Sequence, residues 1–174
     1  AGMITGWGQH QFDLANWAMG TEHTGPRSIE AIAIFPKSGV WDAHGDYMVK
    51  MEYENDLTVY ANNEKPVVIR YEGTEGWIEV YRGNYAATAS DPVSSQAREV
   101  LNASDDAILT SEIGPDEIHL YKSDDHHGNW LECIKTRKQS ITPVEVGHRA
   151  CSMCLLSHIG MKLGRKLYWD PVQE

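Results

Sequence analysis

The spacing of the hydrophobic residues changes between the ends and the middle of this chain, and this change limits the fold more than any other feature of the sequence. Over residues 3–19, apolar and aromatic side chains recur at helical spacing, which predicts an amphipathic helix that ends at Gly20. In the middle of the chain, apolar and polar residues alternate instead, which predicts strands. A chain with these two periods in separate segments is expected to form an α+β fold.

The alternating segments of the middle region predict a series of antiparallel strands. They are residues 31–34, 47–54, 57–62, 67–72 and 77–82. Asn55-Asp56 separates one pair of these segments and Gly73-Thr-Glu-Gly76 separates another, and both are hairpin turn sequences. Successive antiparallel strands imply a sheet with one buried face. We therefore expect a mainly antiparallel open sheet with helices packed on one face.

The last third of the chain returns to the helical period. Asp124 or Asp125 is placed to cap a helix over residues 126–138. Thr142-Pro-Val-Glu145 is a capping box with Pro at the first helical position, and it predicts a second helix that ends at Gly164. Three weaker predictions complete this region: a short helix near Ser94–Leu101, a strand over Ile118–Tyr121 and a last strand over Lys166–Trp169.

Length and composition are those of one folded domain. The 174 residues contain no linker or repeat, so we expect residues 1–174 to form a single domain. The formal net charge of −10 argues against nucleic acid or an anionic membrane as a partner. No apolar run reaches the ~18 residues that a membrane span needs. The three cysteines are irregularly spaced, so we expect reduced thiols rather than disulfides.

Three stretches resemble the substrate domain of Gfo/Idh/MocA-type oxidoreductases. Ala1-Gly-Met-Ile-Thr-Gly-Trp-Gly-Gln-His-Gln-Phe-Asp-Leu-Ala-Asn-Trp17 resembles the helix that opens this domain. The residues from Gly128-Asn-Trp-Leu-Glu-Cys-Ile-Lys-Thr-Arg-Lys138 to Gly164-Arg-Lys-Leu-Tyr-Trp-Asp-Pro171 resemble its C-terminal helix pair and last strand. Tyr71-Glu-Gly-Thr-Glu-Gly-Trp-Ile78 resembles its central hairpin.

The resemblance implies that the chain is the C-terminal half of a bacterial enzyme whose Rossmann domain, which binds NAD or NADP, is missing here. Gly6-Trp-Gly8 lacks the third glycine and the preceding strand of a dinucleotide fingerprint, so we expect no cofactor on this chain alone. The family also implies a sugar or polyol substrate and a homo-oligomer formed through the open sheet. Because the chain opens inside a helical pattern, we expect a longer parent protein. Any targeting segment would precede Ala1, which leaves the localisation open.

His10 is the predicted catalytic residue. The opening helix of the family carries an Asp-x-x-x-His pattern whose His acts near the substrate hydroxyl, and His10 matches this His while Gly6 stands at the Asp position. An imidazole suits proton transfer from a sugar hydroxyl. Asp13 lies three residues beyond His10, near the same helix face, and is a predicted substrate contact. The alternative interpretation of His10 is a structural histidine.

Two further substrate contacts are predicted. Trp41 lies in a loop, where its ring can stack on a sugar face, and His126 opens a helix, where it can reach a cleft. Trp7 and Trp17 are expected in the core because of their helical spacing. Glu64-Lys-Pro66 repeats the letters around the family's catalytic Lys, but it lies between two predicted strands, so we expect a solvated turn.

Four potential metal ligands lie close together in one predicted helix. They are His148, Cys151, Cys154 and His158. One straight helix cannot arrange four ligands around a zinc ion, so we predict no metal site and interpret the cysteines as core thiols.

The leading hypothesis is the substrate-binding and dimerisation domain of an NAD(P)-dependent sugar or glycoside oxidoreductase, incapable of hydride transfer alone. One alternative is a free-standing carbohydrate-binding module, which Gly6 favours because a pure binder needs no proton relay. Another is a stand-alone carbohydrate lyase or hydrolase that acts through His10 and Asp13, with or without a metal ion.

Overall fold

The computed structural model describes residues 1–64, 68–81 and 101–173. The chain divides into two compact units, which we call unit 1 (Ala1–Asn63 with Tyr121–Glu174) and unit 2 (Glu64–Leu120). Each unit contains its own antiparallel sheet. Helices and antiparallel strands together make an α+β fold, as the change of hydrophobic period predicts.

Unit 1 is built on a four-stranded sheet in the order β3-β2-β1-β7. The strands are β1 (Ser28–Ala33), β2 (Tyr47–Glu52), β3 (Thr58–Asn62) and β7 (Leu167–Tyr168). The predicted hairpin between β2 and β3 is confirmed, and Asp56 takes a left-handed conformation with φ 60° in its turn. β7 returns from the end of the chain to pair with β1, so the predicted last strand is confirmed.

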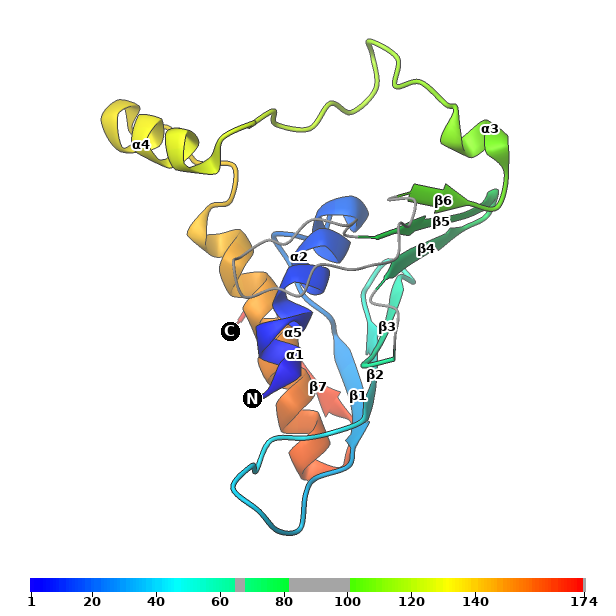
Figure 1. Cartoon of the computed structure of the whole chain (residues 1–174), viewed down its shortest axis with the longest axis vertical. Coiled ribbons are helices and arrows are strands. Elements are labelled where there is room, and N and C mark those ends of the chain that lie inside the picture. The colour runs from blue at the N-terminus through cyan, green and yellow to red at the C-terminus, as the bar shows by residue number, and fades with distance from the viewer. Residues whose placement is uncertain (65–67, 82–100, 174) are drawn as a thin grey trace. The chain divides into compact units, whose positions relative to one another are not determined.

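Three helices cover one face of this sheet (Figure 1): α1 (Met3–Gly6), α2 (Gly8–Met19) and α5 (Val144–Leu163). α5 packs on β1, and α1 and α2 pack along α5. The helix predicted over residues 3–19 is therefore present, but it is divided into two between Gly6 and Gly8. It ends at Gly20, which is left-handed with φ 66°.

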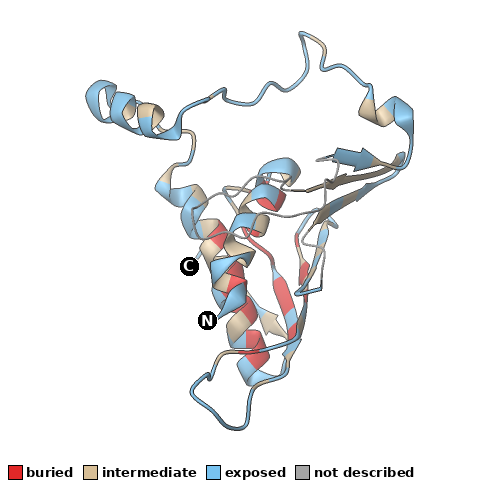
Figure 2. Cartoon of the chain, viewed as in Figure 1, coloured by how far each residue is buried: buried red, intermediate tan, exposed pale blue. Residues whose placement is uncertain are grey.

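The core of unit 1 lies between α5 and the inner face of the sheet (Figure 2). Its fully buried side chains include Ile4, Ile29, Val49, Met51 and Met153. From Ile29 onward in β1, and throughout β2, the residues that alternate with the buried ones are exposed or half-buried, which is the pattern of a sheet covered on one face. Each fully buried side chain of this size contributes about 1.5–3 kcal/mol to the free energy of unfolding.

The two helices of the last third of the chain, α4 and α5, begin in different ways. α4 (His126–Thr136) begins as predicted, because the Asp125 carboxylate accepts a hydrogen bond of 3.1 Å from the His127 amide. The capping box predicted at Thr142 is wrong, since Pro143 is the N-cap of α5 and no side chain caps it. Glu145 is therefore one position too early for the box, and it accepts a hydrogen bond of 2.7 Å from Arg149 instead. α5 ends at left-handed Gly164, as predicted.

Unit 2 contains β4 (Ile69–Gly73), β5 (Gly76–Val80) and β6 (Leu101–Ala103), followed by α3 (Asp106–Leu109). The second predicted hairpin is confirmed by the pairing of Gly73 with Gly76. The strand predicted over Ile118–Tyr121 is wrong: the segment is irregular, and Ile118 is 84% exposed. Alternation in sequence makes a strand only where a neighbouring strand pairs with it, and no described strand pairs with this segment.

Two predictions fall on residues that the structure does not describe. The short helix near Ser94–Leu101 lies outside the described residues except for Leu101, which begins β6. Lys65 and Pro66 also lie outside them. Among the described residues, no helix has both the length and the hydrophobicity to cross a bilayer.

Candidate functional site

α2 turns one face toward the core and the opposite face outward. Phe12, Ala15 and Asn16 are its buried residues. The prediction that Trp7 and Trp17 lie in the core is wrong, because these side chains are 38% and 41% exposed. The helix carries two apolar stripes, and α5 covers the one that continues from Ile4 of α1 through Phe12. The second stripe, with both tryptophans, is left on the outer face.

His10 lies on this outer face and is exposed. Its ring centroid is 5.8 Å from that of Trp7, with an angle of 59° between the ring planes. A surface with an indole beside an imidazole offers an apolar contact for the C–H face of a sugar and a base for its hydroxyl group.

Asp13 is a half-buried carboxyl group in the electrostatic field of His10. Partial burial raises the pKa of Asp13 above its ordinary value, the positive form of His10 lowers it, and the Glu22 carboxylate raises it again. The net direction is upward. Gly6 provides no carboxylate, so Asp13 is the carboxyl group of this helix whose pKa His10 lowers.

Sequence reasoning missed Glu22. This residue follows Gly20, whose left-handed conformation ends α2 and turns the chain. Its Oε2 atom is buried and has no hydrogen-bond partner within the described part of the chain. The Gly20 signal predicts the turn, but only the folded chain shows that the turn places a second carboxyl group near Asp13.

The other two predicted substrate contacts lie on different elements. Trp41 is 79% exposed in the loop between β1 and β2. This loop is attached to the start of the chain, where a ring nitrogen of buried His44 lies 3.0 Å from the carbonyl oxygen of Ala1. His126 is exposed at the start of α4, with its ring centroid 4.1 Å from that of His127. No contact between described residues joins Trp41 or His126 to His10.

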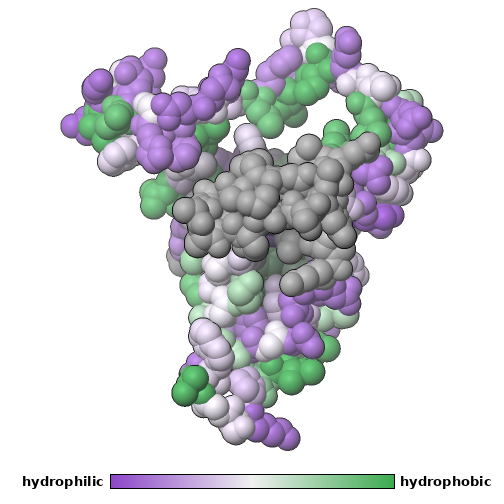
Figure 3. Space-filling model, in the orientation of Figure 1, coloured by the Kyte–Doolittle hydropathy of each residue, from purple (hydrophilic) through white to green (hydrophobic). Residues whose placement is uncertain are grey.

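α4 also carries exposed apolar side chains (Figure 3). Trp130 is 59% exposed and Leu131 is 50% exposed, and no residue of the helix is buried. The exposed apolar side chains of α4 thus lie on the same helix as the exposed His126.

The cysteines are free thiols. Cys154 is buried in the core of unit 1, and burial followed by the nearby Cys151 raises the pKa of its thiol to about 12. Its Sγ atom lies 3.8 Å from Oε1 of Gln9, to which it donates a weak hydrogen bond. Among the described residues, no group of three His, Cys, Asp or Glu side chains is placed to hold a metal ion.

The outer face of the four-stranded sheet combines apolar residues with a row of charges. Ile32, Met48 and Tyr60 are 69%, 54% and 69% exposed on it. At its other end, Lys166 Nζ lies 2.9 Å from Glu30 and 2.8 Å from Glu52. Hydrogen bonds from Lys166, Lys50 and Ser28 lower the pKa of Glu52 to about 2. The charges on this face are therefore paired within the chain, and its apolar part is open.

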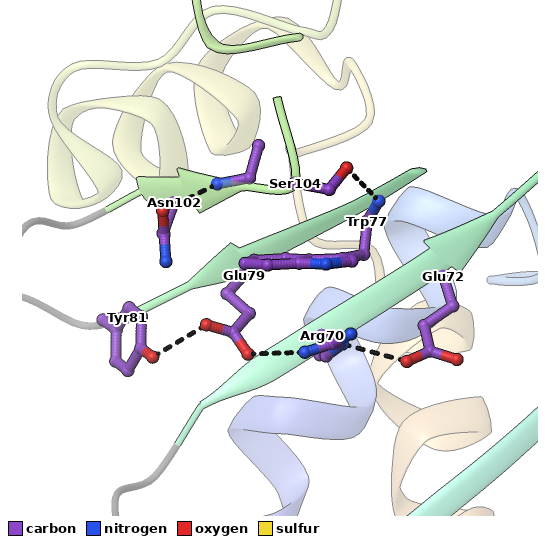
Figure 4. A network of polar contacts seen from close by, with 8 residues as sticks. Arg70, Glu72, Trp77, Glu79, Tyr81, Asn102 and Ser104 are labelled. Atoms are coloured by element: carbon purple, nitrogen blue, oxygen red, sulfur yellow. Dashed lines mark hydrogen bonds and ion pairs between the residues drawn. The ribbon is translucent and has the colours of Figure 1, made fainter. Parts of the chain in front are cut away.

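Unit 2 has a separate polar cluster on one face of its sheet (Figure 4). The Arg70 guanidinium lies 4.3 Å from the centre of the Trp77 ring. It also pairs with Glu72 at 2.9 Å and with Glu79 at 3.3 Å, and the Tyr81 hydroxyl donates to Glu79 at 3.0 Å. The cluster joins β4 to β5, and each of its charged groups has a partner within it, so we interpret it as structural.

The chain resembles solved structures of oxidoreductases over nearly all of its length. It matches an NAD-binding protein from Listeria innocua with 15% identity and a TM-score of 0.59, covering 97% of this chain and 52% of that one. It matches an aldose-aldose oxidoreductase from Caulobacter crescentus with 17% identity and a TM-score of 0.60, covering 93% and 46%. It matches a UDP-N-acetylglucosamine 3-dehydrogenase from Acidithiobacillus ferrooxidans with 14% identity and a TM-score of 0.53, covering 90% of this chain and 47% of that one.

The chain has the fold of one half of these oxidoreductases. It spans about half the length of each of the three matched chains. The half-length α+β domain expected from the end motifs is thus confirmed at the level of the fold. A search with protein-family models and a search of curated proteins give no match.

Proposed function

We propose that this chain is the C-terminal substrate-binding and dimerisation domain of an NAD(P)-dependent oxidoreductase that acts on a sugar or polyol. The observation that carries this proposal is the exposed His10 on a helix that packs within a fold shared with half of several oxidoreductases. The names of two of the matched proteins, an aldose-aldose oxidoreductase and a UDP-N-acetylglucosamine dehydrogenase, support a sugar substrate.

The described residues do not fit a dinucleotide cofactor. Every strand pair among them is antiparallel, and β1 leads directly into β2 rather than into a helix. A dinucleotide site of the Rossmann type requires a strand followed by a glycine-rich turn and a helix. We therefore propose that NAD or NADP binds to another part of the parent protein, and that this chain alone performs no redox reaction.

The chemical role we propose for this chain is proton transfer. Oxidation of a sugar C–H(OH) group would send the hydride of its C–H bond to the NAD(P)⁺ that another part of the parent holds. Its hydroxyl O–H bond breaks, and a ring nitrogen of His10 accepts the proton. Asp13 lies three residues further along α2, and its attraction to the charged form of His10 lowers the pKa of the Asp13 carboxyl group. The Trp7 ring supplies an apolar surface beside the reacting group.

The open face of the four-stranded sheet is the proposed contact with a second copy. Its exposed apolar residues Ile32, Met48 and Tyr60 suit association, and its charges are already neutralised by pairing within the chain. An isologous contact across a two-fold axis would bury these residues against their own copies.

The test uses the full-length parent protein and a panel of sugars and polyols, with NAD or NADP reduction as the readout. We expect the His10→Gln variant to lower kcat by about 10²- to 10⁴-fold with little change in KM. The matched control is His119→Gln, which removes an exposed histidine in unit 2 and should leave kcat unchanged. Wild-type rates in His10→Gln, or binding of NADH to this isolated chain with micromolar affinity, would contradict the proposal.

The carbohydrate-binding module remains a second candidate because Gly6 occupies the position of the family Asp. A pure binder should retain its ligand affinity in His10→Gln, apart from one lost contact. An intact polypeptide of 19.5 kDa in the source cell, rather than one of roughly twice this mass, would favour this candidate.

A further inference from the structure

A groove with a volume of about 730 Å³ lies at one end of the four-stranded sheet of unit 1. We call it the strand-end groove, and it is lined by the start of β1, the turn between β2 and β3, and the segment from Lys166 to Pro171 that contains β7. Small-molecule sites in proteins commonly have volumes of ~300–1,000 Å³. None of its described lining residues belongs to α1, to α2 or to the apolar residues of the proposed contact between copies, so the groove is a separate feature.

The floor of the groove is a row of side chains from four neighbouring strands. Tyr168 of β7 pairs with Ser28 of β1, which also pairs with Glu52 of β2. Glu52 in turn pairs with Thr58 of β3. Residues paired across antiparallel strands share one face of the sheet, so these side chains lie next to one another. The row is on the outer face, because Ile29, the next residue of β1, is buried in the core.

Hydrogen bonds fix this floor. Ser28 is only 5% exposed, and its hydroxyl donates to Glu52 Oε2 at 2.7 Å. Lys166 Nζ donates to the same oxygen at 2.8 Å. The Arg27 amide donates to the Glu52 carbonyl at 2.7 Å, and the Trp169 amide donates to the Arg27 carbonyl at 2.9 Å. A ligand in the groove therefore meets a preorganised surface, which reduces the entropy that is lost on binding.

The rim of the groove carries polar side chains that are accessible to a ligand. The Arg27 and Glu54 side chains are 57% and 81% exposed, and they pair at 3.7 Å, which is longer than an ordinary N–H···O hydrogen bond of ~2.7–3.2 Å. Asp56 and Asp170 are also exposed. The rim thus offers a guanidinium donor and carboxylate acceptors, which a ligand can reach without breaking a short ion pair.

Tyr168 adds an aromatic surface to these polar groups. It is 81% exposed, and Lys166 Nζ lies 5.8 Å from the centre of its ring. The tyrosine is fixed on β7 by the pairing with Ser28. A fixed and exposed tyrosine ring offers a flat apolar contact beside polar groups, which suits a ligand that has an apolar face and a polar edge.

The charges around the groove limit the class of this ligand. The described lining residues include two cationic and four carboxylate side chains, which are those of Arg27, Lys166, Glu52, Glu54, Asp56 and Asp170. The negative excess disfavours a phosphate or carboxylate ligand. An apolar ligand would remove these charges from water without replacing their hydrogen bonds. Sugar hydroxyl groups both donate and accept hydrogen bonds, so a neutral saccharide can satisfy both kinds of charged group.

We propose that the strand-end groove is a binding site for a neutral saccharide, separate from the surface at which His10 is proposed to act. Tyr168 stacks on the C–H face of a sugar ring, Arg27 donates to a ring or hydroxyl oxygen, and Asp56 and Asp170 accept hydrogen bonds from hydroxyl groups. The saccharide binds there without reacting. This inference does not depend on the role proposed for His10, because the groove needs neither the cofactor nor α2.

The test is an NMR titration of the backbone amides of the 174-residue chain with maltotriose, cellotriose, xylotriose and mannotriose, each added separately. We expect at least one of these sugars to shift the amides of Arg27, Tyr168 and Trp169. Tyr168→Ala should weaken this binding by about tenfold, because the stacking surface is lost. Tyr121→Ala is the matched control, since Tyr121 is 54% exposed and lies outside the groove. Absence of shifts at the groove with all of these sugars would overturn the proposal.

Arg27→Ala protects the test against a folding defect in the Tyr168 variant. The bonds of Arg27 to the neighbouring strands use its backbone amide and carbonyl, which the substitution keeps. We expect weaker saccharide binding with an unchanged amide spectrum away from the groove. Equal affinity of the wild type, Tyr168→Ala and Arg27→Ala would overturn the assignment of these residues. Shifts of the same amides with spermidine but with none of the sugars would show that the groove binds cations instead.

The same titration separates this proposal from the proposed function. His10→Gln should leave the shifts at Arg27 and Tyr168 unchanged, because His10 does not line the groove. Sugar-dependent shifts confined to α2 and abolished by His10→Gln would support the proposed function and overturn the groove site. Shifts at the groove in a parent protein whose kcat does not fall in His10→Gln would support the groove site and contradict the proposed function.

Discussion

Gly160 of α5 lies so close to Ala31 of β1 that a Cβ atom built on the glycine would be 3.2 Å from the alanine Cβ. The same Cβ would lie 3.7 Å from Leu167 of β7. This contact sets how near the longest helix approaches the sheet, because neither side has a larger side chain at this point. The core around Met153 and Val49 depends on that distance.

Gly160→Leu should therefore reduce the free energy of unfolding by about 1–3 kcal/mol, because the added side chain forces α5 away from β1. Urea unfolding monitored by circular dichroism measures this change. Gly147→Ala is the matched control, since its Cβ meets nothing within 4 Å in the same helix, and it should stabilise the chain by about 0.5–1 kcal/mol. Equal effects of the two substitutions would contradict the close approach.

Tyr53 makes unfolding sensitive to alkaline pH. Burial raises the pKa of its phenol well above the ordinary value of 10.0. The unfolded chain loses this proton near pH 10 whereas the folded chain keeps it, so stability is full below pH 10 and falls as the pH rises above it. Denaturant midpoints at pH 9 and pH 11 should differ more in the wild type than in Tyr53→Phe. An equal difference in both proteins would show that burial does not raise the pKa of the Tyr53 phenol in the folded chain.

Glu52 makes unfolding sensitive to acid. Its pKa is lowered from 4.5 to about 2, first by the hydrogen bond from Lys166. The stabilisation is present above pH 4.5 and is lost as the pH falls toward 2, because the unfolded chain takes up the proton first. Glu52→Gln should lower stability at pH 7 and flatten its decline between pH 5 and pH 2 in urea titrations. A decline as steep as that of the wild type would assign the acid sensitivity to other carboxyl groups.

Ile32→Lys tests the proposed contact between two copies. The substitution puts a charge beside Met48 in the exposed apolar part of the sheet, so we expect the full-length parent to change from a dimer to a monomer in light scattering after gel filtration. Ile113→Lys is the control, because this residue of unit 2 is 66% exposed and lies outside both sheets. A wild-type monomer, or a variant that remains a dimer, would contradict the use of this face.

The sequence by itself determined the elements whose signals are local. The turn at Asp56, the cap at Asp125 and the left-handed glycines Gly20 and Gly164 all lie where their residue types predict. Each depends on the conformational preference of one residue or on one hydrogen bond to a near neighbour, and such preferences are present before the chain folds.

Tertiary structure decided which of two apolar helix faces is buried and which alternating segments pair as strands. The spacing of Trp7 and Trp17 predicts an apolar stripe, but α5 covers the stripe of Ile4 and Phe12, and the tryptophans stay outside. Ile118 lies in an alternating segment, yet no described strand pairs with it. Hydrogen bonds among Thr21, Asn16 and Tyr53 hold the turn that leads to Glu22, whose carboxylate raises the pKa of Asp13. Local sequence fixes which faces an element has, whereas packing partners distant in the chain select the face that is buried.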